Sequence, residues 1–245
     1  MIAGLCLMAS SVRAAGVPDD CTQLIVALAP DWNSMHGRAQ LLRREGGNWK
    51  PDGKFFPVLF GKNGLAWGSG LAGQDENGLR KKERDGRAPA GIFRIGKIYT
   101  YDAELPGGAD YPFHQVTKSD AWVDDARSPQ YNQFVTIEDP ANPPEWFEKQ
   151  KMRHNDFAYR WLVEIRHNSD PPVPGDGSAI FFHIRRGVNR ATSGCTTMAE
   201  ADLVRVIIWL RAARNPCFAL LTNDVYREKW REWKLPAPKI AGLLP

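Results

Sequence analysis

The sequence lacks the spaced ligand motifs that commonly hold a metal ion. It has no Cys-x-x-Cys pair and no His-Glu-x-x-His segment, and only one of its five histidines lies near a cysteine in the chain. A glycine-rich stretch, residues 64–73, does not end in the Lys-Ser/Thr pair of a phosphate-binding loop, so we interpret it as a strand and a turn. We therefore expect no metal site and no cofactor.

Long hydrophobic runs and a strong net charge are also missing. No segment approaches the roughly 20 apolar residues of a membrane span, and we expect none. The 32 Lys and Arg residues exceed the 28 Asp and Glu residues by a net charge of only +4, and they are scattered, which argues against nucleic-acid binding. With 43% hydrophobic residues, the chain has the composition of an ordinary soluble globular protein.

The first 15 residues are interpreted as a signal peptide. An apolar run, residues 2–8, precedes a small-residue cleavage pattern around Arg13. No Lys or Arg precedes the apolar run, so the charged start of such a leader is missing or trimmed, and a buried first strand is the alternative. Removal of the leader leaves residues 16–245 as the mature chain, outside the cytoplasm.

The cysteines support export to an oxidising compartment. Without the leader, three of the four cysteines remain, Cys21, Cys195 and Cys217. Cys21 and Cys217 each open a short apolar run, and two parallel neighbouring strands would place these thiols at the same end. We predict a Cys21–Cys217 disulfide, which requires an oxidising compartment. Cys195 is then the unpaired thiol.

Short strand-like runs, separated by Gly, Pro, Asn and Asp clusters, dominate the chain and predict an antiparallel sandwich or barrel. The expected strands are 24–28, 38–44, 55–59, 91–99, 134–137, 161–165, 179–183 and 218–221. Apolar residues at helical spacing predict one long helix over residues 198–214, and a short helix is expected within 139–153. No repeat or linker is evident, so we expect a single domain over residues 16–245.

Cys195 stands in a setting that suits a reactive thiol. His183 ends an apolar run twelve positions upstream, Gly194 directly precedes the cysteine, and the expected helix starts just behind it. An imidazole and the free N–H groups of a helix start both favour a thiolate, which is the nucleophilic form. These features predict acyl transfer by a thiol enzyme. A buried core histidine and a buried structural cysteine are the alternative.

Two segments resemble the YkuD-type L,D-transpeptidases. "GRAPAGIFRIG", residues 86–96, is similar to their Thr-Pro-x-Gly-x-Phe-x-Ile segment. "GSAIFFHIRRGVNRATSGCTTM", residues 177–198, is similar to their signature of a strand, a histidine, a loop and [Ser/Thr]-x-Gly-Cys. The resemblance covers residues 24–221. It implies a mainly β catalytic domain of sandwich or barrel type, with one prominent helix after the cysteine, in the periplasm or cell wall.

The resemblance also implies roles for individual residues. Cys195 becomes the nucleophile of a peptidoglycan transpeptidase that acts through a thioester, and His183 becomes its base. Thr192 occupies the Ser/Thr position, and the backbone amides of Ser193, Gly194 and Cys195 become the oxyanion hole. The expected partners are donor and acceptor stem peptides, and we expect a monomer.

Three positions depart from the family pattern. Ser193 stands where many members have His, Thr197 where they have Arg or Asn, and Ile184 where Gly or Ser often follows the histidine. These departures favour the branch that forms 1–3 links, from L-Ala to diaminopimelate, over 3–3 links. Arg185, Arg186 or Arg190, in the loop between His183 and Cys195, is expected to replace the missing basic residue, with a mobile solvated loop as the alternative. An L,D-carboxypeptidase or endopeptidase and a non-catalytic wall-binding module stay open as alternatives.

Residues 120–134 are rich in aromatic and polar groups and are interpreted as a lid over the cleft. A surface loop fixed by its own aromatic packing is the alternative. Tyr159 is a further candidate near the acyl group, with core packing as its alternative. The expected substrate contacts are Trp122, Asp124, Tyr131, Asn132, Tyr159 and Arg185.

Overall fold

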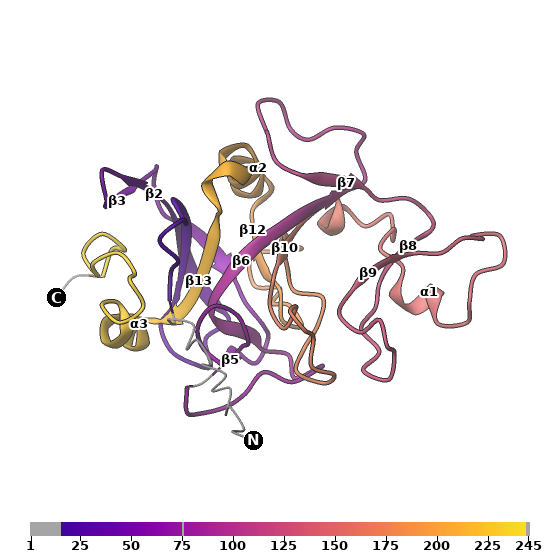
Figure 1. Ribbon diagram of the computed structural model, residues 1–245, viewed down its shortest axis with the longest axis horizontal. Helices are drawn as coiled ribbons and strands as arrows, with labels where there is room; N and C mark the ends of the chain where they lie inside the picture. Colours follow the sequence, from indigo (N-terminus) through magenta and orange to yellow (C-terminus); the bar gives the residue numbers. More distant parts are fainter. Residues whose placement is uncertain (1–15, 75, 244–245) are drawn as a thin grey trace, which may run out of the picture.

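Strands from both ends of the chain form the centre of the molecule. β1 (Gln23–Ala29) pairs in parallel with β13 (Cys217–Thr222) and antiparallel with β2 (His36–Glu45). β1 and β13 are buried at every residue, and a strand covered on both faces requires a continuous apolar run. The computed structural model describes residues 16–74 and 76–243 (Figure 1).

The main sheet closes on itself. From β13 it continues through five further strands to β2, and β2 pairs with β1, so the path forms a barrel. The five strands are β6 (Ala88–Thr100), β10 (Trp161–Ile165), β11 (Phe181–Ile184), β12 (Thr196–Met198) and β4 (Phe56–Leu59). The expected mainly β architecture is confirmed. The sheet is mixed rather than purely antiparallel, because β1–β13 and β11–β12 are parallel pairs.

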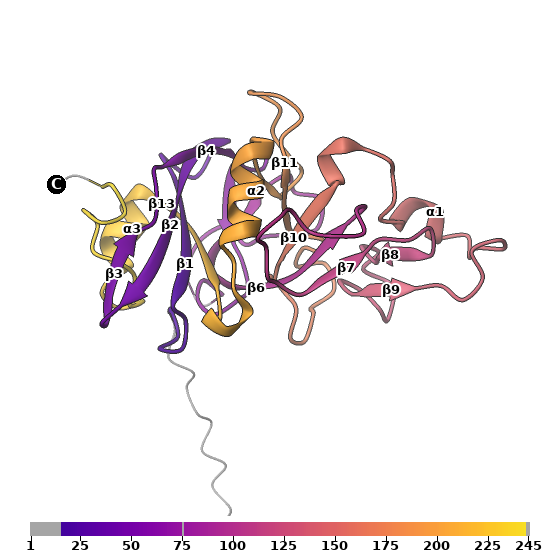
Figure 2. The same cartoon turned by 90° about the horizontal axis from the view of Figure 1, so that it is seen from above.

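A lobe extends from one side of the barrel, where the long β6 leads into it (Figures 1 and 2). A separate two-stranded sheet lies in this lobe. Its two strands stand at the start and at the end of the segment, residues 120–134, that the sequence suggested as a lid. The lobe contains β7 (Phe113–Gln115), β8 (Asp120–Trp122), β9 (Phe134–Thr136) and the short helix α1 (Phe147–Gln150). The remaining small elements are β3 (Asn48–Pro51), β5 (Leu65–Trp67) and the 3₁₀ turns Phe157–Tyr159 and Ala212–Arg214.

The predicted long helix is real but shorter than expected. α2 (Glu200–Trp209) packs its buried Leu203, Val206 and Ile207 against the barrel (Figure 2). The expected first residue, Met198, belongs to β12 instead, and the helix ends at Trp209. α3 (Asn223–Lys229), which was not expected, starts where the Thr222 hydroxyl accepts a hydrogen bond from the Val225 amide. In the described residues, no helix combines the length and apolarity of a membrane span.

One hydrophobic core joins the two ends of the described chain. It includes Val17 near the start and Leu243 at the end, and a smaller cluster around Tyr99 and Phe181 lies toward the lobe. The division into a leader, residues 1–15, and a single domain, residues 16–245, stays a prediction. The leader itself lies outside the described residues.

Cys21 and Cys217 are neighbours, as the parallel pairing of β1 and β13 leads one to expect, but both are free thiols in this structure. A hydrogen bond from the Cys217 thiol lowers the pKa of Cys21, and the same contact raises the pKa of Cys217. The predicted disulfide is therefore not formed here. It stays a prediction for protein that has passed through an oxidising compartment.

Exported protein is expected to contain the Cys21–Cys217 disulfide. Because the bridge would close a loop of almost the whole chain, it should stabilise the fold by about 5 kcal/mol. Alkylation in denaturant, followed by mass spectrometry with and without reduction, measures the number of free thiols. Three alkylated cysteines in the unreduced mature chain would contradict the disulfide, and a Cys195→Ala variant identifies the remaining thiol.

Candidate active site

The two expected reactive side chains come from neighbouring parallel strands. His183 lies in β11, Cys195 directly precedes β12, and His183 is paired with Thr197 in the register. Alternate residues of a strand share a face, so Cys195 and Thr197 face the same side as Phe181 and His183. Cys195 and His183 also line one cavity of about 450 Å³, which we call the His-side cavity. The structure thus brings the predicted pair together.

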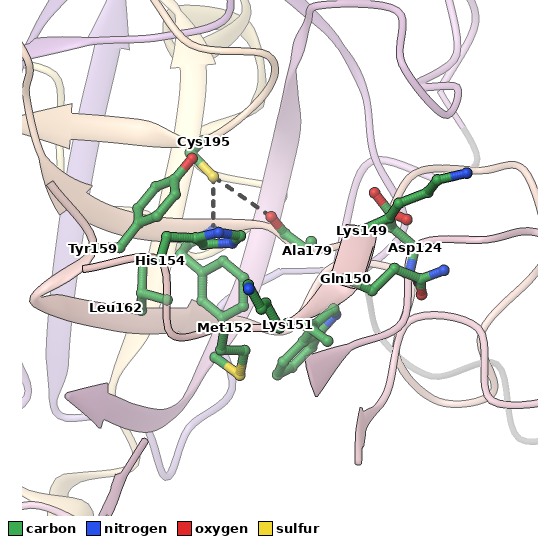
Figure 3. Close-up of a pocket in the computed structure, with 12 residues that line it drawn as sticks. Asp124, Lys149, Gln150, Lys151, Met152, His154, Tyr159, Leu162, Ala179 and Cys195 are labelled. Atoms are coloured by element: carbon green, nitrogen blue, oxygen red, sulfur yellow. Dashed lines mark hydrogen bonds between the residues drawn. The ribbon is translucent and has the colours of Figure 1, made fainter. Parts of the chain in front are cut away.

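A second cavity also opens at the thiol. This Trp-side cavity of about 200 Å³ is lined by Cys195, Trp122, Tyr159 and His154, among others (Figure 3). The Cys195 thiol donates a hydrogen bond to the Ala179 carbonyl at 3.5 Å and accepts one from the Phe181 amide at 3.4 Å. Burial raises the pKa of Cys195 to about 11, although the Phe181 amide opposes this shift. The resting cysteine is therefore a neutral thiol.

The expected contribution of a helix start to the thiolate is wrong. β12 separates Cys195 from α2, whose N-cap is Ala199. Because a strand rises by about 3.3 Å per residue, these four residues place the helix start about 13 Å along the chain. The effect of a helix dipole fades beyond its first turn. The helix start was predicted too early because the helical spacing of apolar residues was extended back to Met198, which belongs to β12.

His183 is held as a neutral imidazole. Its side chain is 3% exposed, and its Nδ1 lies 2.9 Å from the Ile184 carbonyl oxygen. A carbonyl only accepts, so Nδ1 carries the proton and Nε2 has the lone pair of a base. Burial lowers the pKa of His183 to about 4, although the Ile184 carbonyl opposes this shift. In the described contacts, no hydrogen bond joins His183 to Cys195, so the thiol must rotate away from Ala179 to reach the imidazole.

The neutral histidines predict a loss of stability in acid. Burial also lowers the pKa of His167 to about 4, and its Nδ1 accepts a hydrogen bond from the Ser69 amide. The unfolded chain binds protons at both histidines below about pH 6.5, whereas the folded chain does not until about pH 4. Stability should therefore fall as the pH drops through this window, by up to about 3 kcal/mol for each histidine.

Urea unfolding at a series of pH values measures this loss. A His167→Gln variant is the control, because it should lose the part of the dependence that His167 contributes in this window. A flat stability profile between pH 6.5 and pH 4 in the parent protein would contradict the assignment of neutral, buried imidazoles.

The loop before Cys195 is fixed by Thr192. Its hydroxyl donates to the Cys195 carbonyl at 2.6 Å and accepts from the Gly194 amide at 3.0 Å. The Gly194 amide is therefore occupied, which corrects its expected place in the oxyanion hole. No described residue accepts a hydrogen bond from the amides of Ser193 and Cys195, so these two remain candidates. Gly194 has to be small, because an added Cβ would lie 3.0 Å from the Arg87 carbonyl oxygen.

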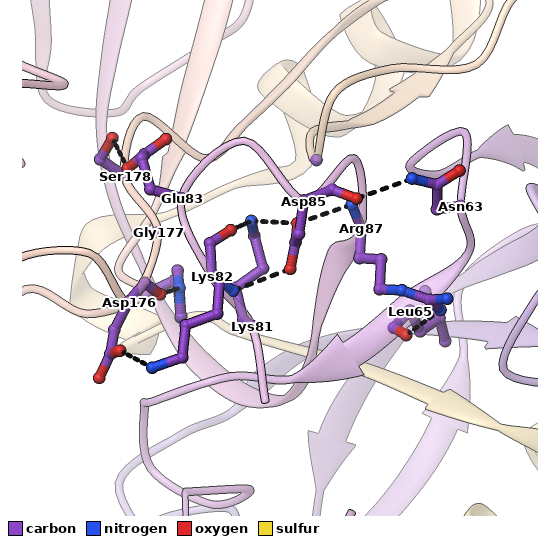
Figure 4. Close-up of polar contacts among 12 residues, drawn as sticks. Asn63, Leu65, Lys81, Lys82, Glu83, Asp85, Arg87, Asp176, Gly177 and Ser178 are labelled. Atoms are coloured by element: carbon purple, nitrogen blue, oxygen red, sulfur yellow. Dashed lines mark hydrogen bonds and ion pairs between the residues drawn. The ribbon is translucent and has the colours of Figure 1, made fainter. Parts of the chain in front are cut away.

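A buried lysine lies behind this loop and was missed in the sequence. The side chain of Lys81 is 3% exposed, and its ammonium pairs with Asp85 at 2.6 Å (Figure 4). Asp85 also accepts hydrogen bonds from the Lys82 and Arg87 amides, both at 2.8 Å, which ties the loop together. Lys81 lines the His-side cavity, and its charge favours the Cys195 thiolate. In the sequence, residues 81–85 look like an ordinary solvated run of charges.

Lys81→Met is expected to destabilise the protein by about 3 kcal/mol, because it leaves the Asp85 carboxylate without its buried counterion. Urea unfolding measures the change. The double variant Lys81→Met/Asp85→Asn should recover part of the loss, since it removes the orphaned charge as well. If the free energy of unfolding of Lys81→Met lies within about 1 kcal/mol of the parent value, the Lys81–Asp85 pair is unimportant for the fold.

The described residues contain no group of three or more His, Cys, Asp or Glu side chains placed to hold a metal ion. The family model of the YkuD L,D-transpeptidase catalytic domain matches residues 41–216. The chain belongs to this family. Members of the family act on peptidoglycan. Comparison with curated proteins found no match, and comparison with solved structures found none either.

The cleft of this YkuD-family protein contains three of the expected substrate contacts. Trp122 lines the Trp-side cavity, and Asp124 and Tyr159 line both cavities at the thiol. Tyr131 is wrong as a substrate contact: it is 2% exposed, and its hydroxyl donates to the Glu83 carboxylate. Tyr131 is buried beneath its own loop. This agrees with the alternative interpretation of residues 120–134, a surface loop fixed by its own aromatic packing.

Asn132 is also wrong as a substrate contact, because its side chain is used up inside the protein. Its carbonyl accepts hydrogen bonds from the Trp122 indole and the Ala179 amide, both at 3.0 Å. Its NH₂ group donates to the backbone carbonyls of His167 and Asn168. Asn132 thereby fixes the positions of Trp122 and Ala179, which line the Trp-side cavity together with Cys195.

Arg186, not Arg185, faces the cleft. Arg186 lines the His-side cavity, pairs with Asp156 and lies over the Tyr159 ring at 4.7 Å. Arg185 lines neither cavity at the thiol. Arg185 stands two residues after His183 and would share its face if β11 continued, but the strand ends at Ile184. Of the three arginines expected to replace the missing basic residue, Arg186 lines a cavity at the thiol, whereas Arg185 and Arg190 do not.

Proposed function

We propose that this chain joins peptidoglycan stem peptides by acyl transfer through a thioester on Cys195. The observation that carries the proposal is the position of Cys195, which opens into two cavities, one of which it shares with the neutral His183. A transferase must hold a donor and an acceptor at one nucleophile, and two adjoining cavities suit that requirement. The family membership gives peptidoglycan as the material acted on.

The first half of the reaction forms the thioester. His183 Nε2 takes the proton of the Cys195 thiol, and the sulfur attacks the carbonyl carbon of an L,D peptide bond in the donor. The amides of Ser193 and Cys195 stabilise the oxyanion. The C–N bond then breaks, and the proton on His183 passes to the leaving amine.

The second half transfers the acyl group. The side-chain amine of diaminopimelate on a second stem attacks the thioester carbonyl, the new C–N bond forms and the C–S bond breaks. The amine proton returns through His183 to the sulfur. No cofactor enters these steps. If water replaces the amine, the same residues act as an L,D-carboxypeptidase or endopeptidase.

We favour a 1–3 link, from L-Ala to diaminopimelate, over a 3–3 link. The support is the set of departures at Ser193, Thr197 and Ile184. Thr197 is 1% exposed and its hydroxyl has no hydrogen-bond partner, so the basic group found there in many relatives is replaced by a small, buried side chain. A donor subsite without that basic group suits a donor residue that carries no second carboxylate.

The test is a mass-spectrometric product assay. The chain from Gly16 onward is incubated with disaccharide-peptide monomers, with Cys195→Ala in parallel. Cross-linked dimers that are absent from the variant support the transpeptidase, and their fragmentation separates 1–3 from 3–3 links. Shortened stems without dimers indicate a hydrolase. Binding to peptidoglycan without any Cys195-dependent product indicates the wall-binding module.

Export is part of the proposal, since peptidoglycan lies outside the cytoplasm. Cell fractionation and N-terminal sequencing of the mature protein test it. The expected result is periplasmic protein that starts close to Gly16. Protein confined to the cytoplasm with Met1 intact would contradict export.

A further inference from the structure

Asp124 lies where three cavities meet. It lines the His-side cavity and the Trp-side cavity, both of which contain Cys195. It also lines a third, outer cavity of about 810 Å³, together with Arg84 and Lys149. Figure 3 shows Asp124 and Lys149 on the side of the cavity opposite to Tyr159. A ligand that extends from the outer cavity toward the thiol must therefore pass Asp124.

The Asp124 carboxylate forms no ion pair with the described residues. No described side chain forms a hydrogen bond or an ion pair with its oxygens, and its backbone amide donates to Gln150 at 3.0 Å, which fixes the residue against α1. Burial and the nearby Glu83 carboxylate raise the pKa of Asp124, and the charge of Arg84 opposes part of this shift. A further cation at Asp124 would stabilise this half-buried carboxylate.

The neighbouring carboxylates are already engaged. Glu83 accepts hydrogen bonds from the hydroxyls of Tyr131 and Ser178, and Asp125 accepts from Arg127 at 2.8 Å. Glu145 of the outer cavity is also unpaired among the described residues, but it lines neither cavity at the thiol, so Asp124 is the unpaired carboxylate that reaches Cys195. Arg84 and Lys149 are exposed cations of the outer cavity, placed to meet a ligand carboxylate.

These charges complement an α-amino acid centre, in which an ammonium and a carboxylate share one carbon. We propose that Asp124 binds the ammonium group at the side-chain end of a diamino acid, and that it thereby selects an amine acceptor over water at the thioester. Arg84 and Lys149 bind the carboxylate of the same centre. This assignment rests on the proposed function, because it concerns the acceptor of that reaction.

The chemistry of the step balances without a further reactant. The bound ammonium loses one proton to solvent, and its nitrogen attacks the thioester carbonyl. The C–N bond forms, the C–S bond breaks and Cys195 regains its proton from the attacking nitrogen. Asp124 orients the amine and raises its concentration beside the thioester. Water, which carries no charge, gains no such advantage from the carboxylate.

The first arm of the test measures binding without catalysis. In the Cys195→Ala protein, NMR titration with meso-diaminopimelic acid is compared with pimelic acid, which has the same carbon chain without amines. We expect diaminopimelic acid to bind about 10-fold more tightly, and Asp124→Asn to remove this difference. Asp139→Asn, an exposed acid of the same lobe that lines none of the three cavities, is the matched control.

The second arm measures the fate of the thioester in the Cys195 protein. Asp124→Asn is expected to lower the ratio of cross-linked to hydrolysed product by about 10-fold, whereas Asp139→Asn leaves it unchanged. Equal loss of both products, or unchanged binding of diaminopimelic acid, overturns the proposal. If the parent protein forms no Cys195-dependent product, the proposed function fails, and the binding arm still decides whether Asp124 holds an ammonium group.

Discussion

Cys195→Ala is expected to abolish every covalent product, with a loss of at least about 10⁴-fold in turnover. No other described thiol can replace it, because Cys21 and Cys217 are fully buried and line neither cavity at the thiol. The fold should survive the substitution. The thiol makes only two weak hydrogen bonds, at 3.4 and 3.5 Å.

The measurement is the rate of dimer and shortened-stem formation by mass spectrometry, with urea unfolding to show that the variant is folded. Cys21→Ala is the control for general thiol chemistry and should retain turnover. A folded Cys195→Ala protein with more than about a hundredth of the parent rate would exclude the thioester mechanism.

His183→Gln is expected to lower turnover by about 10³-fold, while binding of the donor changes little. Glutamine can preserve a hydrogen bond to the Ile184 carbonyl but cannot accept the thiol proton as a base. Because the resting thiol has a pKa of about 11, almost none of it is thiolate at pH 7 without that base. The histidine is therefore needed at the moment of attack.

The pH dependence gives this prediction a second readout. Since the pKa of His183 is about 4, the parent should keep its activity down to about pH 5 and lose it as the pH falls through 4, where the imidazole becomes protonated. In His183→Gln, the remaining activity should rise steadily with pH toward the pKa of the thiol. His36→Gln, an exposed histidine of β2, is the control.

Turnover in His183→Gln within 10-fold of the parent, or an acid limb in the parent near pH 6.5, would contradict the role of a neutral, buried base. Iodoacetamide labelling of the parent should also be slow at pH 7, because the thiol is protonated and faces Ala179. Slow labelling alone does not indicate an inert protein here. Turnover has to be measured beside it.

That His183 and Cys195 lie at one cavity was predictable because the two residues are close in the chain. A strand, a loop and a second strand suffice to place His183 beside the residues that follow Cys195, and the sequence between them carries the family signature. The error at the helix start has an equally local origin. β12 is only three residues long, and so short a strand leaves no periodic pattern that separates it from the helix behind it.

The substrate side of the cleft was predicted less well. Trp122, Tyr131 and Asn132 all lie in one aromatic and polar segment, and the sequence does not indicate which of them face solvent. The structure places Trp122 in the cavity and turns Tyr131 and Asn132 inward, where Glu83 and the backbone near His167 satisfy their polar groups. Those partners are distant in the chain, so local sequence has no signal for them.

The sequence by itself determined the mainly β fold, the position of the main helix and the proximity of Cys195 and His183. Each of these depends on periodicity or on order along a short segment. Only the tertiary structure decided the protonation of the pair, the buried Lys81–Asp85 contact and the unpaired Asp124 at the junction of the cavities. The reason is physical: burial and charge pairing set these properties, and both arise between segments that meet only when the chain folds.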